Sequence, residues 1–437
     1  MIKKSFAASA AFIAIAGLSP AAFAQDAAGA ASDTSVFVFN TLLFLMSGMV
    51  VMFMAAGFCM LEAGLVRSKN AATICLKNIA LYSVAGLMVW LIGYNLIYGV
   101  ETGGLLANPF TDFPWRADDS DPVGVGYSAG SDWFFQMVFV ATAASIVSGT
   151  VAERIKLFPF LIFVAILTGV IYPIQASWEW GGGFLDANFG FSDFAGSTLV
   201  HSTGGWAALA GAYVLGPRAG KYEGGKVTPI PGSSLPLATL GTFILWLGWF
   251  GFNGGSQLAM GTIEDAASVS NIFVNTNMAA CAGVVTSIIL TQILYKKVDL
   301  TIVLNGAIGG LVSITAEPLA PSILQAVFIG AIGGVIVTVS IPLLDKLKID
   351  DVVGAIPAHL FCGIWGTLIV PLSNGDATYG GQIVGILMIG AFVYIVSLAL
   401  WFALKYTMGI RASEQEEREG LDKSELGLEA YPDFAST

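Results

Sequence analysis

Charged side chains and histidines are both scarce in this sequence. Asp, Glu, Lys and Arg together make up 11% of the 437 residues, whereas a soluble domain carries about 25%. This shortfall excludes a soluble globular protein. Histidine occurs only twice, at His201 and His359. The net charge of −11 argues against a nucleic-acid partner.

Cysteine is also rare. The chain has four, Cys59, Cys75, Cys281 and Cys362, which lie in apolar segments without paired spacing. We therefore expect small buried hydrophobic side chains, and neither a disulfide framework nor a metal site.

Long apolar runs dominate the rest of the chain. Hydrophobic residues make up 56% of it, and its mean hydropathy is +0.77. Runs of about 18 or more apolar residues can cross the ~30 Å of hydrocarbon in a bilayer. The sequence thus predicts an all-α polytopic membrane protein with about eleven transmembrane helices. We expect these spans near 36–65, 73–99, 132–151, 157–177, 197–216, 234–253, 264–292, 299–315, 322–343, 352–372 and 382–408.

The N-terminus has the three parts of a signal peptide. Lys3 and Lys4 form a basic region, an apolar core follows, and Ala22-Phe23-Ala24 is a cleavage motif. We expect residues 1–24 to be removed, the alternative being an uncleaved first helix. Residues 25–410 then form one transport domain in the membrane, and residues 411–437 a polar cytoplasmic tail.

Basic residues alternate between the connections, and cytoplasmic loops are the ones that collect Lys and Arg. The connections after spans two, four, six, eight and ten hold one basic residue between them, Arg116. The connections after the other spans, and the end of the last span, hold Arg67, Lys69, Arg154, Lys156, Arg218, Lys221, Lys226, Lys296, Lys297, Lys346, Lys348, Lys405 and Arg411. This alternation predicts an N-terminus outside the membrane, a cytoplasmic C-terminus and an odd number of spans.

Both histidines lie in an internal repeat. The segments "DFAGSTLVHSTGG" and "DVVGAIPAHLFCG" share the spacing D-x2-G-x4-H-x3-G, so that Asp193, Gly196, His201 and Gly205 match Asp351, Gly354, His359 and Gly363. The first copy opens span five and the second opens span ten, which runs in the opposite direction. Residues 36–217 and 234–372 are then inverted repeats, with the helix at 382–408 outside the symmetry.

The repeat brings the two histidines toward the middle of the bilayer from opposite sides. Each histidine lies eight residues beyond its aspartate, or ~12 Å along a helix. Ionisable residues at such depth usually mark a pathway or a proton relay, and the alternative is a polar side chain bonded to a neighbouring helix. For Asp193 and Asp351 we favour helix capping, with attraction of a cation as the alternative.

The chain resembles the ammonium transporter family (Amt/Rh), in its bacterial Amt branch. The resemblance covers nearly all of the mature sequence. It rests on motifs in the expected order: "GFCMLEAGLVRSKN", "VSGTVAERIK", "WGGGFL", "DFAGSTLVH", "GWFGFNGGS", "DDVVGAIPAHLFCGIWGTL" and "GIRASEQEEREGLDKSE".

The resemblance implies a fold and a function. It implies an eleven-helix protomer in a homotrimer of the bacterial inner membrane, with one pore through each protomer. The substrate is ammonium or ammonia, with methylammonium as an analogue. The protein is then not an enzyme and needs no cofactor, and a cytoplasmic PII-type protein is its regulatory partner.

The resemblance also implies roles for individual residues. The paired pore histidines fall on His201 and His359. The external cation site falls on Phe139, Trp180 and Ser256. The gate below that site falls on Phe139 and Phe252, with Phe135 nearby, and Trp249 matches a pore-lining tryptophan. Asp193 matches a helix-five aspartate of the family.

Two features depart from the family pattern. The tail has Leu426 where a histidine is usual, which puts its regulatory contacts in doubt. Pro357 and Ala358 precede His359 where glycine and a branched apolar residue are common.

The residue types suit the implied substrate. Trp and Phe are cation–π partners worth roughly 0.5–2 kcal/mol per contact, and a serine hydroxyl supplies a hydrogen-bond acceptor. For Trp180 the alternative is a residue of the aromatic belt at the membrane interface. A bare cation crosses an apolar constriction at a cost of several kcal/mol, whereas neutral ammonia crosses far more easily.

Two other classes of protein fit parts of the pattern. His201 and His359 are able to serve as the two axial ligands of a haem in an electron-transfer protein. An ammonium sensor coupled to PII-type signalling is the second alternative.

Overall fold

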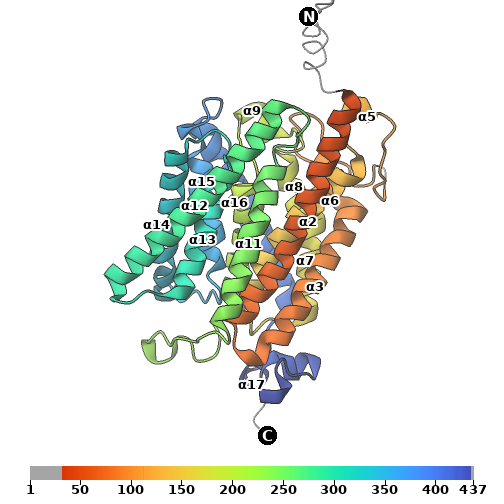
Figure 1. Ribbon diagram of the computed structural model, residues 1–437. Coiled ribbons are helices and arrows are strands. Elements are labelled where there is room, and N and C mark those ends of the chain that lie inside the picture. Colours follow the sequence, from red (N-terminus) through yellow and green to blue (C-terminus); the bar gives the residue numbers. More distant parts are fainter. Residues whose placement is uncertain (1–31, 112, 435–437) are drawn as a thin grey trace, which may run out of the picture.

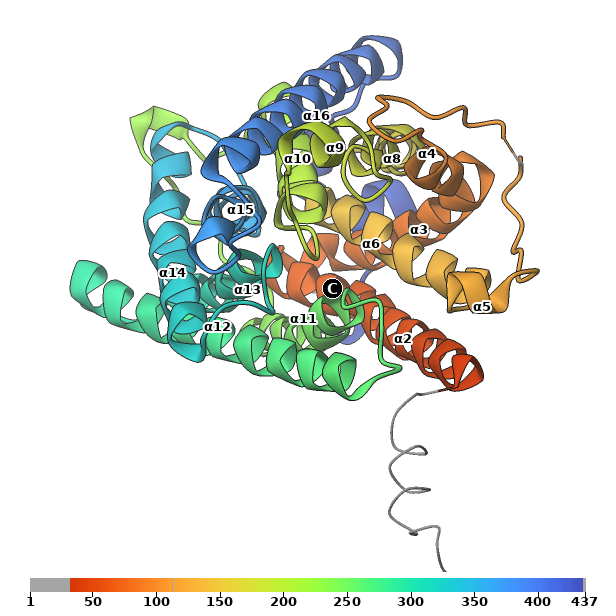
Figure 2. The same ribbon diagram turned by 90° about the horizontal axis from the view of Figure 1, so that it is seen from above.

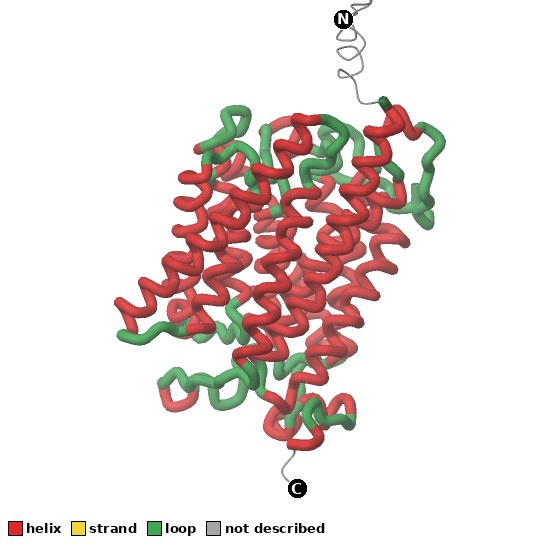
Figure 3. Tube along the Cα trace, in the orientation of Figure 1, coloured by secondary structure: helices red, strands yellow, loops and turns green. Residues whose placement is uncertain are grey.

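The computed structural model describes residues 32–111 and 113–434, which form one bundle of helices (Figures 1 and 3). The predicted signal peptide, with its cleavage site at Ala22–Ala24, lies outside the described residues. We call the end of the bundle that carries α5 and α9 the upper face, and the end that carries the C-terminal tail the tail face.

Eight helices of the described residues are long and apolar enough to cross a membrane. The other three predicted spans fall on the shorter helical runs 197–215, Leu300–Thr315 and Ile356–Leu372. The eleven spans therefore correspond to α2 (Asp33–Leu65), η1 to α4 (Ser68–Tyr98, with α3 at Ala71–Met88), α6 (Ala129–Thr150), α7 to α8 (Leu157–Ser177), η4 and α10 (Ser197–Ser202, Thr203–Leu215), α11 (Leu235–Gly255), α12 (Ile263–Tyr295), α13 (Leu300–Thr315), α14 (Ile323–Lys346), η6 to η7 (Ile356–Leu372, with α15 at Cys362–Leu368) and α16 (Tyr379–Thr407).

The predicted all-α class and span positions are confirmed, with differences at the ends. The span expected at 352–372 begins at Ile356, because the preceding residues form a turn in which Gly354 has a φ of +79°. Two short helices, α5 (Pro122–Val125) and α9 (Phe184–Phe189), lie in connections on the upper face (Figure 1).

Local sequence explains where several spans begin. Ser234, Thr262, Ser322 and Thr378 each stand at the N-cap of a span and accept a hydrogen bond from a backbone N–H of the first turn. Such caps satisfy N–H groups that have no partner within the helix. In a membrane these groups have no water to replace the missing partner.

Helix α6 runs through the middle of the bundle (Figure 2). Of its most apolar stretch, 89% is buried, whereas the corresponding share for the other long helices lies between 33% and 56%. The peripheral helices expose large apolar side chains, as expected of surfaces that face lipid or another subunit.

Helices α2 and α11 pack closely through glycine. The Ser234 N–H at the start of α11 donates to the Gly64 carbonyl at the end of α2, at 3.0 Å, so the two helices run in opposite directions. A Cβ atom on Gly64 would lie 2.5 Å from the Ala238 nitrogen, and one on Gly241 would lie 2.3 Å from the Leu61 nitrogen. Small residues allow this approach, which favours helix association in membranes.

The C-terminal tail folds back onto the tail face as α17 (Glu414–Glu419) and the π-helical turn η8 (Asp422–Leu426) (Figure 1). The Asp422 carboxylate accepts from the N–H groups of Ala72 and Thr73, at 2.9 and 2.7 Å, at the start of α3. The Glu425 carboxylate accepts from the Leu157 N–H at 3.0 Å, at the start of α7. The tail thus supplies acidic caps to two transmembrane helices.

The four cysteines are free thiols. Cys362 is buried, as expected, whereas Cys59 and Cys281 are half-buried and Cys75 is exposed. The expectation of a buried side chain is therefore wrong for Cys75. The cause is its position on the outward side of α3, where apolar sequence faces the surroundings of the bundle and not its core.

Candidate functional site

A cavity of about 440 Å³ opens below the upper face. Of the residues predicted for a cation site, Phe139, Trp180 and Ser256 all line it. They come from α6, from the end of the α7 to α8 span and from the C-terminal end of α11. The Phe139 and Trp180 rings meet edge to face, with centroids 6.1 Å apart. The structure therefore brings together three side chains that are far apart in the sequence.

Phe139, which lines the cavity, stacks on a second phenyl ring. Phe139 and Phe252 lie with centroids 3.9 Å apart and an interplanar angle of 22°. Both are almost fully buried. Phe135 lies one turn before Phe139 and contacts it edge to face at 4.7 Å. A ring stack in van der Waals contact leaves no opening, so passage through it requires ring motion.

The two histidines lie beyond the stack. The His201 ring is 5.2 Å from the Phe252 ring and 4.9 Å from the Trp249 ring, with which it is nearly parallel. The Nδ1 atoms of His201 and His359 are 3.2 Å apart. Phe58, on α2, lies 6.1 Å from the far side of His359. The contacts form a continuous row from the cavity to the middle of the bundle.

The Nδ1 contact fixes how the two histidines are protonated. One Nδ1 must donate and the other must accept, so the neutral rings are opposite tautomers. One ring then has an acceptor at Nε2 and the other a donor. His201 Nε2 is buried and has no hydrogen-bond partner among the described residues. The pair thus offers both a donor and an acceptor to a small polar molecule.

Each histidine sits in a π-helical turn that opens a broken span, η4 for His201 and η6 for His359. The repeated aspartates hold the starts of these turns. Asp193 accepts from the N–H groups of four residues at 2.7 to 3.0 Å, namely Gly196, Ser197, Thr198 and Leu199. Asp351 accepts from the Ile356 N–H at 2.7 Å and from the Thr150 hydroxyl at 3.0 Å. Helix N-termini with such partners occur where substrate paths break a membrane helix.

The repeated glycines let the two broken helices cross. A Cβ atom on Gly205 would lie 2.6 Å from the Leu360 Cβ, and one on Gly363 would lie 2.4 Å from the Ser202 Oγ and the Ser197 carbonyl oxygen. Each glycine therefore packs against the π-helical turn of the other repeat. This reciprocal contact explains the spacing from histidine to glycine, because it holds the two imidazoles at hydrogen-bonding distance.

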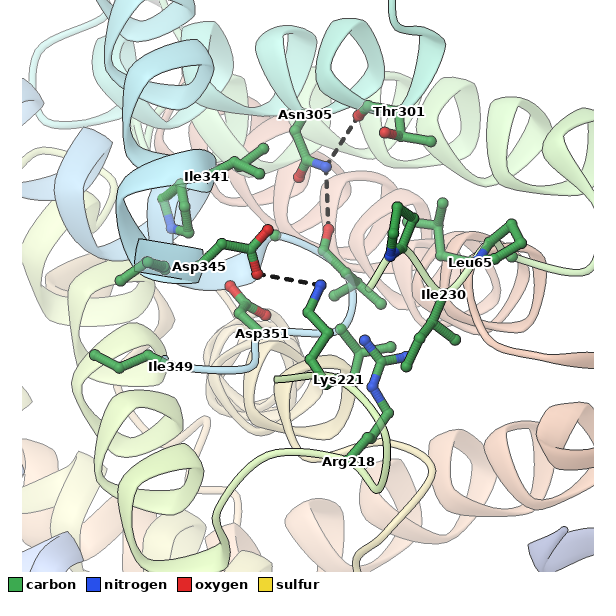
Figure 4. Close-up of a pocket in the computed structure, with 18 of the residues that line it drawn as sticks. Leu65, Arg218, Lys221, Ile230, Thr301, Asn305, Ile341, Asp345, Ile349 and Asp351 are labelled. Carbon is green, nitrogen blue, oxygen red and sulfur yellow. Dashed lines mark hydrogen bonds and ion pairs between the residues drawn. The ribbon is translucent and has the colours of Figure 1, made fainter. Parts of the chain in front are cut away.

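A second cavity, of about 310 Å³, lies toward the tail face (Figure 4). Asp351, Gly354 and Pro357 line it, together with the ion pair of Lys221 and Asp345 at 3.1 Å. Lys221 and Arg218 both project toward this cavity in Figure 4. Of the predicted site residues, Phe135, Phe139, Trp180 and Ser256 line the upper cavity and Asp351 lines the second one, whereas the two histidines line neither.

A basic and acidic cluster surrounds the tail-face cavity. Arg218 binds Asp350 with a 2.9 Å ion pair and lies 3.6 Å from Glu153, which itself pairs with Arg67 at 2.5 Å. Burial by itself would raise the pKa of Asp350, but the guanidinium groups of Arg154 and Arg218 outweigh it and hold that pKa well below its usual range. These buried groups fix the ends of four spans to one another.

The geometry of the two histidines does not fit haem ligation. Two axial nitrogens, each about 2 Å from a metal, would be about 4 Å apart, and a macrocycle would have to lie between the rings. The observed nitrogen separation is 3.2 Å, and Trp249, Phe252 and Phe58 occupy the space around the pair. In the described part of the chain, no cluster of three His, Cys, Asp or Glu side chains is placed to hold a metal ion.

Several residues at the site were not identified from sequence. Phe44 stacks on Phe135 at 5.3 Å, and Tyr127 contacts Phe44 edge to face at 4.9 Å. Asp132 and Gln136 line the upper cavity. They are four residues apart, and each lies three residues before a phenylalanine of the site, Phe135 or Phe139. This spacing places them on the same side of α6, which is the one signal that the sequence contained.

This bundle, with its interior row of aromatic and imidazole rings between two cavities, defines a polytopic membrane transport protein. Residues 42–431 match the family described as the Ammonium Transporter Family. The chain belongs to this family, which consists of transporters and not of enzymes.

Individual relatives agree with this assignment. Ammonium transporter Amt2 of Archaeoglobus fulgidus is 40% identical over 424 residues, covering 90% of this chain and 88% of the relative. A putative ammonium transporter of Synechocystis is 41% identical over 401 residues, with coverage of 90% and 89%.

Solved structures show the same fold. A protein described as a sensor Amt protein superimposes with a TM-score of 0.83 at 34% identity, over 89% of this chain and 98% of that chain. Mep2 of Candida albicans superimposes with a TM-score of 0.77 at 26% identity, over 86% and 87% of the two chains. The predicted fold class, with its two inverted sets of five spans and an eleventh helix, is confirmed by this match.

Proposed function

We propose that this protein takes up ammonium across the membrane through the interior path described above. The cation is recruited at Phe139, Trp180 and Ser256, loses a proton, and crosses as ammonia past the Phe139–Phe252 stack and along His201 and His359. The observation that carries this proposal is the unbroken series of contacts from the upper cavity to the paired imidazoles.

The chemistry of the upper site suits ammonium. The Phe139 and Trp180 rings offer π faces and edges around one space, and cation–π contacts strengthen when they are shielded from water. The Ser256 hydroxyl donates its proton to the Phe252 carbonyl at 2.9 Å. Its oxygen lone pairs are therefore directed away from that bond and are able to accept an N–H from the substrate.

The apolar surroundings of the two histidines favour deprotonation of ammonium before it passes the Phe139–Phe252 stack. Phe252, Trp249 and Phe58 surround the histidines with apolar surface, where a bare cation is costly and ammonia is not. The two neutral imidazoles then provide ammonia with both an acceptor and a donor. The proton either remains outside or crosses by a separate relay through the same pair, and these alternatives differ in whether transport carries charge.

The test is transport by the purified protein in liposomes. We expect an ammonium concentration jump to produce uptake, and potassium to produce none. A charge signal indicates that a proton accompanies ammonia, whereas methylammonium uptake without a charge signal indicates neutral transport. A protein that moves neither ammonium nor methylammonium under these conditions would refute the proposal.

We also propose how the protein is placed in the cell. The basic residues of alternate connections favour an inner-membrane protein with the upper face outside and the tail face in the cytoplasm, after removal of residues 1–24. The family resemblance favours a homotrimer with one path per protomer. Protease accessibility of the tail in oriented membranes and native mass spectrometry test these two points separately.

A sensor coupled to a PII-type protein is the second candidate function. It is favoured by the 34% identity to a protein described as a sensor Amt protein, and by a tail that folds over the tail face, where Glu417 accepts from the Ala219 N–H. If a His359→Ala variant kept its regulatory output while its transport was lost, signalling would be the better description. If both were lost together, transport would be the primary activity.

A further inference from the structure

One carboxylate lines the upper cavity. Asp132, in the first turn of α6, is the single charged side chain among the described residues that line it. The other lining residues include three tyrosines, Gln136 and the predicted cation site of Phe139, Trp180 and Ser256. Nothing in the family resemblance assigns a role to this aspartate, so its presence in the same cavity as the cation site needs its own explanation.

Two polar side chains contact the buried Asp132 carboxylate. Asp132 is 6% exposed, and the Tyr94 hydroxyl donates a hydrogen bond to its Oδ2. The Gln136 side chain also interacts with this carboxylate. Gln136 follows one helical turn later on the same side of α6 and lines the same cavity. The site thus combines a carboxylate and an amide side chain at one polar, enclosed space.

Asp193 shows what a purely structural carboxylate looks like in this protein. Its two oxygens accept from four backbone N–H groups, which leaves no capacity for a ligand, and it does not line the cavity. Asp132 holds no helix terminus in this way. A buried carboxylate with few donors is expensive to keep, and a cationic ligand would offset that penalty.

The surroundings keep Asp132 in place. The Tyr94 ring contacts Trp115 at 5.0 Å, and Trp115 stacks on Trp133 at 5.6 Å. Tyr94 and Tyr98 form the wall between the upper cavity and a neighbouring one, of about 600 Å³, where Arg116 lies. The loop that carries Trp115 therefore positions Tyr94, and Arg116 lies on the far side of the tyrosine wall from the carboxylate.

We propose that Asp132, with Gln136 beside it, forms a carboxylate subsite that binds the substrate cation ahead of the aromatic site. This inference rests on the proposed transport function and deepens it. The carboxylate raises the local concentration of any small monovalent cation, and the aromatic site then selects among those cations. Asp132 is thus a recruiting residue that sets the apparent affinity for ammonium, whereas discrimination against potassium lies with Phe139, Trp180 and Ser256.

The experiment measures ammonium transport by the full chain in proteoliposomes as a function of ammonium concentration and ionic strength. We expect Asp132→Asn to raise KM by roughly tenfold, the effect of losing one partly screened charge, with little change in the maximal rate. The KM of the wild type should rise with ionic strength, because salt screens the carboxylate. The KM of the variant should change much less.

Four variants separate recruitment from a structural role. Asp132→Glu keeps the charge and should keep KM within about threefold of the wild type. Tyr94→Phe removes only the hydrogen bond to the carboxylate and should change KM less than Asp132→Asn does. Gln136→Glu combined with Asp132→Asn moves the charge by one turn and should restore much of the affinity. Asp376→Asn, at an exposed position of a connection on the upper face, alters the net charge equally and should leave KM unchanged.

The outcomes distinguish failure of the proposed transport function from failure of the recruiting role of Asp132. If the wild type fails to transport ammonium at any concentration, the proposed function itself is wrong. If the wild type transports and the neutral variant has the same KM and the same salt dependence, the recruiting role of Asp132 is wrong. If Asp132→Asn does not fold, the KM of Asp132→Ser and the salt dependence of the wild-type KM test the recruiting role instead. An equal loss of rate in the Asn and Glu variants, with KM unchanged, would indicate a structural role and overturn the inference.

Discussion

The Nδ1 atoms of His201 and His359 lie 3.2 Å apart although 158 residues separate them in the chain. The contact joins two π-helical turns that enter the bundle from opposite faces, each one crossing next to a glycine of the other repeat. Because one nitrogen must donate and the other accept, the two rings function as a unit. Every prediction about the path through the protein depends on this pairing.

Removal of one imidazole should disable the pair. We expect His359→Ala to reduce ammonium transport in proteoliposomes by at least about tenfold, the effect of one lost hydrogen-bonding group at a barrier, and to leave His201 with both ring nitrogens unpaired. The control is Trp401→Phe, which alters the buried stack on Phe163 at 3.8 Å, away from the row of rings. Transport by the His359 variant at the wild-type rate would contradict the pairing argument.

Asp193 should be essential for the turn that carries His201. Replacement by Asn introduces an NH₂ donor where four backbone N–H groups are directed. We expect the free energy of unfolding to fall by about 3 kcal/mol, since buried donors lose a charged acceptor. The thermal melting temperature in detergent measures this loss. The matching substitution Asp186→Asn, in α9, should have little effect, and an equal loss there would argue against a specific role for Asp193.

Glu62 and Lys77 are buried ionisable residues that both bind Ser148. The Ser148 hydroxyl donates to Glu62 at 2.7 Å, and Lys77 donates to the Ser148 carbonyl at 3.0 Å. We expect Lys77→Met alone to destabilise the protein by about 3 kcal/mol, because it leaves an unpaired buried carboxylate. The double variant with Glu62→Gln should recover much of that loss. A double variant less stable than the single one would show that the charges do not compensate each other.

Asp350 should make stability depend on pH. Its pKa is lowered in the folded protein by Arg154 and Arg218, so the stabilisation is complete above the unfolded value of about 4 and is lost as pH falls through the folded value. Asp350→Asn should therefore melt earlier than the wild type near neutral pH, and the difference should shrink in acid. Melting curves across pH measure it, and a difference that grew in acid would contradict the sign.

The tail should detach when its caps are removed. Asp422→Asn weakens the acceptor for the N–H groups of Ala72 and Thr73 and for the Thr73 hydroxyl. We expect a loss of about 1–2 kcal/mol of docking, seen as faster proteolysis after Gly409. The exposed neighbour Lys423→Ala serves as the control. Equal protection in both variants would show that other contacts, such as that of Glu425 with Leu157, hold the tail.

The positions of most spans were predictable because each span must by itself be long and apolar enough to cross the membrane. An apolar run such as 382–408 needs no partner to be recognised, and α16 forms there with nearly those bounds. The predicted helix boundaries were wrong where the local turn of the chain decides where a helix starts. The span expected from residue 352 begins at Ile356, because Asp351 and Gly354 turn the chain before the helix starts.

The site was predictable in part for a similar reason. The sequence marked His201 and His359 by their rarity and their repeat, and the resemblance marked Phe139, Trp180 and Ser256. Phe44, Phe58 and Asp132 carried no such signal, because phenylalanine within a membrane helix and an acidic residue in its first turn are both common. They join the site only through the way that α2 and α6 pack around it.

The sequence by itself determined that this is a membrane protein with eleven spans, and that two equivalent histidines lie within them. Composition and periodicity suffice for this because every span must present an apolar surface to the hydrocarbon of the bilayer. Only the tertiary structure decided that the two imidazoles share a hydrogen bond, that Phe139 and Phe252 stack on each other, and that the Asp132 carboxylate lines the upper cavity. These are distances between distant parts of the chain, and they depend on how closely glycines allow the helices to cross.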